Sequence, residues 1–240
     1  MTDGPPSGDA DPSEPGSEVG VAAILLAAGS GSRIGGDRPK AFLGVGGRSL
    51  LTMSAEAACG SSFVTSLVVV VPEGWEGRAG ALVPSGIGAT IVVGGSTRQD
   101  SVRLALAALP ASTGVVVVHD AARVLASSAL FDAVVSALAS DEAAAGAIPV
   151  VTIPDTVKRV DDGWVAETVD RSGLVIAQTP QAFHAPALAA AHERAAADGL
   201  LFTDDAALME WAGERIRVVP GEPGNFKVTT PDDLERLAAR

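Results

Sequence analysis

The stretch VGVAAILLAAG, residues 19–29, decides the fold of this chain. Residues 19–28 form a continuous apolar run, without the alternation of polar and apolar residues that marks a strand with one face in water. A run of this kind that stops at Gly29 predicts a strand buried on both faces. Such strands are typical of a parallel sheet covered by helices, so the stretch indicates an α/β fold.

The rest of the chain continues this alternation of strand and helix. Further strands are predicted at residues 66–71, 89–93, 115–118, 147–151, 174–179 and 216–219, and helices at residues 48–59, 97–109, 128–139, 185–198, 204–212 and 231–240. Within residues 128–139, the apolar positions Phe131, Val134 and Leu138 recur at helical spacing. We therefore expect one Rossmann-like α/β domain over residues 19–240, with a mostly parallel sheet and helices on both faces.

The alternation breaks after residue 151. Residues 152–160 and 164–169 predict two strands around an Asp-Gly turn, which is typical of a β-hairpin. A hairpin inserted into a parallel domain has edges that must be covered, and pairing with a second subunit would cover them. We expect residues 152–171 to form a β-arm that makes a homodimer.

The composition excludes several classes of partner. The 240 residues include 17 Lys and Arg against 29 Asp and Glu, which gives a formal charge of −12. Nucleic acids and anionic membranes need a basic face, so neither is an expected partner. The apolar runs are too short to span a bilayer. The single cysteine, Cys59, excludes an intrachain disulfide, and no basic residue precedes Arg33, so a cytoplasmic location is expected.

Residues 1–18 differ from the rest. Ten of these eighteen residues are Gly, Pro or Ser, and five more are acidic. Such a segment buries too little apolar surface to offset its chain entropy. It is expected to be a disordered acidic tail.

A glycine-rich loop, LAAGSGSRIGGDRPK at residues 26–40, follows the first predicted strand. Ligands of open α/β sheets bind at the carboxyl ends of strands, and glycines let backbone N–H groups approach phosphate oxygens. The loop matches neither of two familiar phosphate-binding motifs. A dinucleotide fingerprint that starts at Gly29 needs glycine where Ile34 stands, and a P-loop that starts at Gly31 needs lysine where Asp37 stands.

Two cations in this loop point to phosphoryl or nucleotidyl transfer. Arg33 and Lys40 are seven residues apart in a segment that can fold over a polyphosphate. Cations placed there would stabilise the charge that develops during transfer. The alternative is that both are solvated loop cations.

Eight segments, in order along the chain, resemble the 2-C-methyl-D-erythritol 4-phosphate cytidylyltransferases of the sugar-nucleotidyltransferase superfamily. They are LLAAGSGSRIGGDRPKAFL at 25–43, GGSTRQDSV at 94–102, VHDAARV at 118–124, PDTVKRV at 154–160, ETVDRSGL at 167–174, QTPQAF at 178–183, TDDAALME at 203–210 and NFKVTTPDDL at 225–234. One segment alone would be a weak signal, but together they are highly specific. The family usually has proline after the arginine of the third segment, where this chain has Val124.

The resemblance implies transfer of a cytidylyl group from CTP to 2-C-methyl-D-erythritol 4-phosphate, with release of pyrophosphate, in the non-mevalonate isoprenoid pathway. It implies that Arg33 and Lys40 are catalytic. Asp120 follows a predicted strand beside the phosphates, and hard cations prefer carboxylate oxygens, so Mg²⁺ or another divalent ion is expected to bind there. The resemblance assigns CTP contacts to Ala27, Ala28, Gly29, Gly31, Gly95, Ser101 and Ala121, and acceptor contacts to Thr156, Arg171, Lys227 and Arg123.

Each of these residues also has a plain structural interpretation. Ser96 or Thr97 could cap a helix, and Asp120 could cap a helix or pair with Arg123. Arg171 and Lys227 could be solvated surface cations. Since the acceptor phosphate is already ionised, no general base is needed and His119 is assigned no role.

Two other functions stay open from the sequence. Transfer of the cytidylyl group to ribitol 5-phosphate would use the same loops for CTP and differ only in the acceptor pocket. A non-catalytic nucleotide-binding module would retain CTP binding without turnover.

Overall fold

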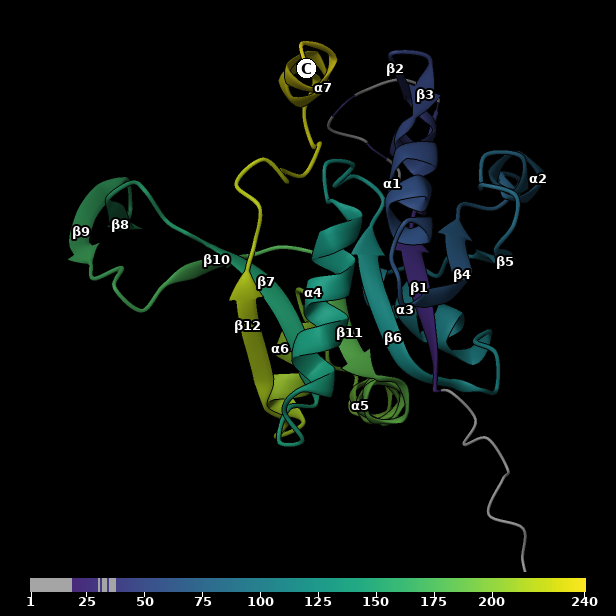
Figure 1. The fold of residues 1–240 in the computed structure, drawn as a ribbon. Helices are drawn as coiled ribbons and strands as arrows, with labels where there is room; N and C mark the ends of the chain where they lie inside the picture. The colour runs from purple at the N-terminus through teal and green to yellow at the C-terminus, as the bar shows by residue number, and fades with distance from the viewer. Residues whose placement is uncertain (1–18, 30, 32–33, 35–37) are drawn as a thin grey trace, which may run out of the picture.

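The computed structural model describes residues 19–29, 31, 34 and 38–240. Its centre is an eight-stranded sheet in the order β10-β7-β11-β6-β1-β4-β5, with β12 paired to β7 (Figure 1). The strands are β1 (Gly20–Leu26), β4 (Val64–Val71), β5 (Gly88–Val93), β6 (Thr113–Asp120), β7 (Gly146–Thr152), β10 (Val175–Ala177), β11 (Gln181–His184) and β12 (Ile216–Pro220). The predicted α/β fold with a mainly parallel sheet is confirmed.

The first predicted strand is the centre of this sheet. β1 pairs in parallel with β4 on one side and with β6 on the other. Its neighbouring residues Ile24 and Leu25 point to opposite faces, and both are fully buried. The continuous apolar run therefore reflects a strand that is covered on both faces.

Helices cover both faces of the sheet. The main helices are α1 (Leu50–Cys59), α3 (Arg98–Ala107), α4 (Ser128–Ala139), α5 (Ala185–Ala197) and α6 (Asp205–Trp211). α1 and α4 pack on one core layer with Leu25 of β1, whereas α3, α5 and α6 pack on a second layer with Ile24. Among the residues that the structure describes, no helix has the length and apolarity needed to cross a membrane.

Several shorter elements complete the chain. They are the 3-10 helix η1 (Lys40–Phe42), the small pair β2 (Gly44–Val45) and β3 (Arg48–Ser49), α2 (Glu76–Gly80) and the C-terminal α7 (Pro231–Ala238). Residues 48–49, predicted as the start of a helix, instead form β3, and Ser49 then caps α1 by accepting a hydrogen bond from Thr52 N. The helix start was misplaced by two residues because polar residues suit a cap as well as a first turn.

One strand escaped the sequence pattern. β11 consists of only four residues and pairs antiparallel with both β6 and β7, which makes the sheet mixed. The predicted strand at 174–179 is shorter, because only β10 pairs there with β7. A Thr179–Pro180 peptide bond in the cis form separates β10 from β11. A polar-ended tetrapeptide after proline gives no periodic signal.

The predicted hairpin forms as a separate two-stranded sheet of β8 (Val157–Asp161) and β9 (Trp164–Val169). Asp162 and Gly163 both have positive φ, of 44° and 79°, as the predicted Asp-Gly turn requires. Figure 1 shows this β-arm extending away from the sheet and its helices. Its Trp164 side chain is 79% exposed.

Candidate active site

A cavity of about 440 Å³ lies at the carboxyl ends of β1 and β6. It is lined by Leu26, Ala27, Ala28, Gly29, Gly31, Lys40, Ala41, Gly95, Ser96, Thr97, Arg98, Ser101, Asp120, Ala122, Lys227 and Thr229. Four chain segments that are remote in sequence meet here, as expected for the ligand edge of an open α/β sheet. Nine of the residues assigned from the resemblance lie in this lining: Ala27, Ala28, Gly29, Gly31, Lys40, Gly95, Ser101, Asp120 and Lys227.

The loop after β1 begins as an extension of the sheet. Ala27 N donates a hydrogen bond to Val70 O of β4 at 2.8 Å, which fixes where the loop leaves β1. Further along, Gly31 has a φ of +69°, and a Cβ atom built on it would lie 2.8 Å from Lys40 Cβ. Glycine is therefore required at this position both for its backbone conformation and for the approach of Lys40.

Lys40 is held at the cavity by its apolar neighbours. It begins η1, whose Ala41 and Phe42 are buried. The Phe42 ring packs 4.5 Å from the ring of Trp75, centroid to centroid. Because this side of η1 is anchored in the core, Lys40 stays at the cavity wall. Arg33, the second cation expected to be catalytic, lies outside the described residues.

The loop between β5 and α3 forms the opposite wall. Thr97 caps α3 through a capping box with Asp100, which confirms one of the two caps expected from the sequence. Gly95 N donates to Ser101 Oγ at 3.1 Å, and Ser101 Oγ donates to Thr97 O. A Cβ atom on Gly94 would lie 2.6 Å from Ala28 Cβ, so this glycine lets the two loops touch. Gly95 and Ser101 thus lie directly across from the loop after β1.

Asp120 is the last residue of β6. Among the described residues that line the cavity, it is the only one with a carboxylate. Its Oδ2 accepts a hydrogen bond from Lys227 Nζ at 2.6 Å, and its Oδ1 lies 3.5 Å from Arg98 Nε. Burial opposes ionisation of this carboxyl, but the charges of Arg98 and Lys227 outweigh it and hold its pKa well below the usual range. The direct side-chain partners of Asp120 are thus Lys227 and Arg98, and neither structural alternative from the sequence, a helix cap or an ion pair with Arg123, describes these contacts.

Lys227 reaches Asp120 from the loop before α7. Val228 N donates to Ala122 O at 2.9 Å, which ties this loop to the chain after β6. Asn225 is fully buried, and its side-chain amide donates to Thr179 O at 3.0 Å. These bonds place a C-terminal lysine beside a carboxylate 107 residues earlier in the chain.

A second buried carboxylate, which no sequence motif indicated as a site residue, lies near the cavity. Asp205, at the start of α6, lies with Oδ2 2.8 Å from the guanidinium of Arg98 and with Oδ1 3.0 Å from His192 Nε2. The preceding residue, Asp204, caps α6 by accepting a hydrogen bond from Ala207 N. Arg98 stood within a recognised segment, yet nothing in the sequence places it beside Asp205.

Two of the assigned residues lie next to the cavity rather than in its lining. Ala121 is fully buried, and its N–H donates to Leu26 O at 3.2 Å, linking β6 to β1. The guanidinium of Arg123 donates to the backbone carbonyls of Asn225 and Ala177. Val124, which stands where the family usually has proline, is buried in a small apolar cluster with Leu50 and Val228. Here Arg123 and Val124 hold the surrounding loops together.

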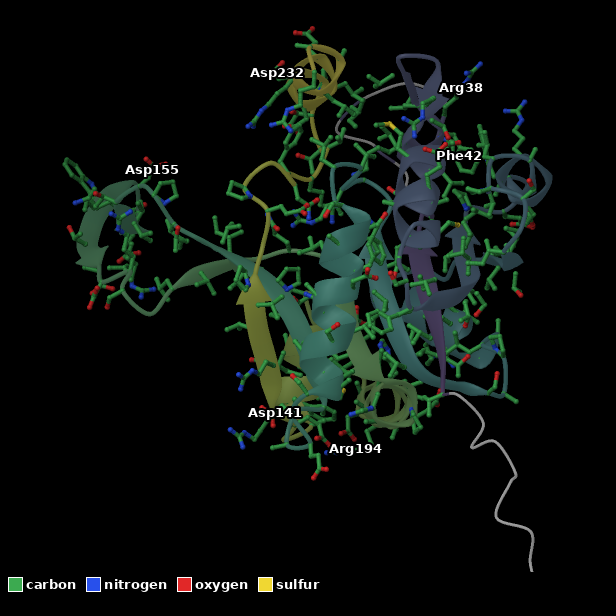
Figure 2. All side chains as sticks on the ribbon, in the orientation of Figure 1. Arg38, Phe42, Asp141, Asp155, Arg194 and Asp232 are labelled. Atoms are coloured by element: carbon green, nitrogen blue, oxygen red, sulfur yellow. The ribbon has the colours of Figure 1, made fainter. Side chains whose placement is uncertain are left out.

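The last two assigned residues lie on the β-arm. Thr156 directly precedes β8, and Arg171 follows β9. Arg171 donates to the backbone carbonyls of Ile153 and Asp155 within the arm. Figure 2 shows Asp155 on the projecting arm, well apart from Phe42 beside the cavity loop. The structure does not bring Thr156 and Arg171 to the cavity of their own chain.

His119 lies beneath the cavity floor. It is fully buried, its Nδ1 lies 3.0 Å from Thr179 Oγ1, and its ring packs on Phe131. Burial lowers its pKa to about 4, so the ring is neutral near pH 7. It does not line the cavity, which agrees with assigning it no role in the reaction.

This fold and this cavity define an α/β nucleotidyltransferase domain: glycine-rich backbone, cationic side chains and one carboxylate gather at the carboxyl ends of a mainly parallel sheet. The family model of IspD, 2-C-methyl-D-erythritol 4-phosphate cytidylyltransferase, matches residues 21–239. The chain belongs to this family.

Individual relatives agree. The 2-C-methyl-D-erythritol 4-phosphate cytidylyltransferase of Rhodococcus jostii is 46% identical over 215 residues, which cover 89% of this chain and 92% of that protein. The bifunctional enzyme IspD/IspF of Clavibacter michiganensis is 47% identical over 92% of this chain. The chain spans about half the length of such bifunctional relatives, 54% in this case.

Solved structures also match. The 2-C-methyl-D-erythritol 4-phosphate cytidylyltransferase of Thermus thermophilus superimposes with a TM-score of 0.75 at 35% identity, covering 90% of this chain and 96% of that one. The 4-diphosphocytidyl-2C-methyl-D-erythritol synthase of Anaerococcus prevotii gives a TM-score of 0.80 at 31% identity, covering 92% and 97%.

Proposed function

We propose that this chain transfers the cytidylyl group of CTP to 2-C-methyl-D-erythritol 4-phosphate, giving 4-diphosphocytidyl-2-C-methyl-D-erythritol and pyrophosphate. One observation carries the proposal. The cavity joins the backbone of the loop after β1, Lys40 and the Asp120–Lys227 pair in a chain that the family matches over residues 21–239. The product would serve the non-mevalonate isoprenoid pathway.

The nucleotide would lie between the two facing loops. Backbone groups of residues 27–31 can take the triphosphate, since glycines leave N–H groups accessible to phosphate oxygens. Gly95 and Ser101 on the opposite wall can contact the cytosine base. Ala121, directly after β6, would support nucleotide binding through its backbone hydrogen bond to Leu26 O of β1.

The reaction needs positioning and charge stabilisation more than proton transfer. An oxygen of the acceptor phosphate attacks the α-phosphorus of CTP in line, and the bond from that phosphorus to the bridging oxygen of pyrophosphate breaks. Lys40, together with Arg33, would stabilise the charge on the α-phosphate in the transition state. The attacking phosphate is already ionised, so no base has to remove a proton.

The residues present fit a magnesium ion. Mg²⁺ is commonly bound by one or two carboxylates together with substrate phosphates and water. In the described part of the chain no cluster of three or more His, Cys, Asp or Glu side chains could hold a metal alone. Asp120 supplies one buried, ionised carboxylate to the cavity and would hold the ion together with CTP. The bound ion would supply further charge neutralisation for the phosphates.

The acceptor phosphate would bind cations from two places. Lys227 already lies at the cavity, where the phosphate would compete with Asp120 for its ammonium group. Thr156 and Arg171 lie on the arm, so we propose that the chain forms a homodimer in which each arm serves the partner's cavity. Exposed apolar residues on the arm, Val160, Trp164 and Val165 among them, would be covered in that dimer. Arg123 would act by holding the loop of Lys227.

We also propose that the enzyme works in the cytoplasm. The chain has one cysteine, Cys59, so no disulfide can form within it. Low cysteine use suits a reducing compartment.

Pyrophosphate release tests the proposed function. The chain is incubated with Mg²⁺ and CTP, with either 2-C-methyl-D-erythritol 4-phosphate or ribitol 5-phosphate as the acceptor. Release with the first acceptor alone is the expected result. Release with ribitol 5-phosphate alone would keep the loop chemistry and overturn the acceptor. CTP binding without release in either case would point to a non-catalytic module.

A further inference from the structure

Arg98 connects the cavity to a buried carboxylate that the proposed reaction does not use. It begins α3, lines the cavity and keeps 27% of its side chain exposed. One side of its guanidinium group faces Asp120 at 3.5 Å, and the other side contacts Asp205 at 2.8 Å. A single arginine thus bridges a carboxylate at the cavity and a carboxylate behind the wall.

Asp205 is held in place from its far side. Its side chain is 2% exposed, and Nε2 of His192, itself 1% exposed, lies 3.0 Å from Oδ1. Together with Lys227 these groups form one continuous row of polar contacts, from α5 in the core to the cavity: His192, Asp205, Arg98, Asp120 and Lys227. A buried carboxylate is costly unless it is paired, so Asp205 and Arg98 depend on each other.

We propose that Asp205, supported by His192, is a positioning residue that holds the Arg98 guanidinium at a fixed distance from Asp120. This inference rests on the proposed function. With Arg98 shared between two carboxylates, Asp120 keeps Lys227 as its nearer partner, at 2.6 Å against 3.5 Å. Without the charge of Asp205, the guanidinium would turn fully to Asp120 or into the cavity. The carboxylate and the lysine that face the substrates would then be displaced.

The decisive variant is Asp205→Asn, which keeps the side-chain size and removes the charge. Because a small displacement of reacting groups is costly, kcat should fall on the order of 10- to 100-fold, with a smaller change in the KM for CTP. Asp204→Asn is the matched control. Asp204 caps α6, an asparagine can replace it as a cap, and its side chain accepts hydrogen bonds from Ala207 N and Gln181 Nε2. Its charge acts on Arg98 more weakly than the charge of Asp205 does, and it makes no ion pair with that guanidinium group. Its kcat should stay within about threefold of the parent chain, as for surface changes that keep a cap.

A double-mutant cycle separates positioning from loss of folding. Arg98→Lys keeps a positive charge but lacks the planar guanidinium fork that contacts both carboxylates. If Asp205 acts through Arg98, the variant with both changes should be no slower than the slower single variant. The inference would be overturned if the kcat losses of Asp205→Asn and Arg98→Lys multiplied in the double variant. It would also be overturned if Asp205→Asn kept the parental kcat, or if Asp204→Asn and Asp205→Asn lost kcat equally.

Two further measurements keep the test decisive. If Asp205→Asn does not fold, as judged by its thermal melting curve, His192→Gln takes its place in the cycle, because it disturbs the support of Asp205 and leaves the Arg98 contact present. If the parent chain releases no pyrophosphate, the proposed function has failed. The same cycle is then read from CTP affinity by calorimetry, where coupling between Arg98 and Asp205 supports the inference and independent effects refute it.

Discussion

The cavity and the β-arm place charged residues in opposite environments. At the cavity, Asp120, Arg98 and Lys227 come from distant segments, contact one another and are mostly buried. On the arm, Arg159 and Glu167 form an ion pair at 2.7 Å with side chains 66% and 53% exposed. Exposed pairs of this kind contribute about 0–1 kcal/mol, whereas buried charges require partners to be tolerated at all. Folding of a single chain therefore pairs the charged side chains at the cavity with one another, whereas the charged side chains of the arm remain exposed to solvent.

Among the variants that test this contrast between cavity and arm, Lys40→Ala should lower kcat the most. Lys40→Ala removes a cation proposed to face the α-phosphate, so kcat should fall by about 10²–10³, the cost of removing one donor that stabilises a developing charge. The thermal melting temperature should be unchanged, since Ala41 and Phe42 still anchor η1.

Lys158→Ala is the matched control for this variant. Lys158 is one of only three lysines, and it lies on the arm, where its Nζ donates to Thr168 Oγ1. Pyrophosphate release should stay near the parental rate. An active Lys40→Ala chain would remove the main chemical argument for the cavity.

The second test asks whether arm and cavity belong to one site. Lys40→Ala and Arg171→Ala should each be nearly inactive, and mixing them should restore activity if each arm serves the partner's cavity. Random exchange makes half of the dimers mixed, each with one intact site, so about a quarter of parental activity is expected in this C₂ arrangement. The measurement is pyrophosphate release after equilibration of the mixed subunits.

Sedimentation of the parent chain is the control for that mixing experiment. It should give a dimer at the concentration of the assay. No recovery of activity, or a fully active monomer, would show that the arm does not complete a neighbouring site.

The smallest effect concerns how the Lys227 loop is fastened. Asp233 accepts hydrogen bonds from Thr229 N and Thr230 N in the capping box of α7. Slight burial raises the pKa of this carboxyl, but these hydrogen bonds outweigh it and lower the pKa to about 2 from 3.8. Asp233→Asn should therefore cost only about 0.5–1 kcal/mol of unfolding free energy, as for an exposed cap.

The pH dependence of that cost has a definite sign. A lowered folded-state pKa adds stability that is fully present above the unfolded pKa and is lost as the pH falls through the folded value. The difference in unfolding free energy between parent and Asp233→Asn should be constant from pH 7 to about pH 5 and should narrow below about pH 4. A difference that widens on acidification would contradict the assigned cause.

Most of the fold was predictable because it follows from local patterns. The run at 19–28 identified the central strand, residues 128–139 identified α4 with both of its ends, and the Asp-Gly turn identified the hairpin. β11 was missed because its place between β6 and β7 depends on pairing partners, and not on its own four residues. The strand pattern around the Asp-Gly turn likewise predicted the arm without indicating where it would extend.

The site was predictable to the extent that its residues stand in recognisable segments. Nine assigned residues reached the cavity lining, because each lies at or after the carboxyl end of a strand, and these ends lie at the same edge of the sheet. Contacts between side chains were harder to predict from the sequence. The sequence suggested Arg123 as a partner for Asp120, whereas the structure gives that place to Lys227 and Arg98.

By itself, the sequence determined the alternation of strands and helices, the glycine-rich loop and the supply of cations, because each depends on residues close together in the chain. Tertiary structure alone decided which charges meet. The row from His192 to Lys227 joins α5, α6, α3, β6 and the C-terminal loop, and it exists only because the sheet and its helices bring these segments together. Pairing energies of buried charges depend on distance and burial, and neither is encoded in residue spacing along the chain.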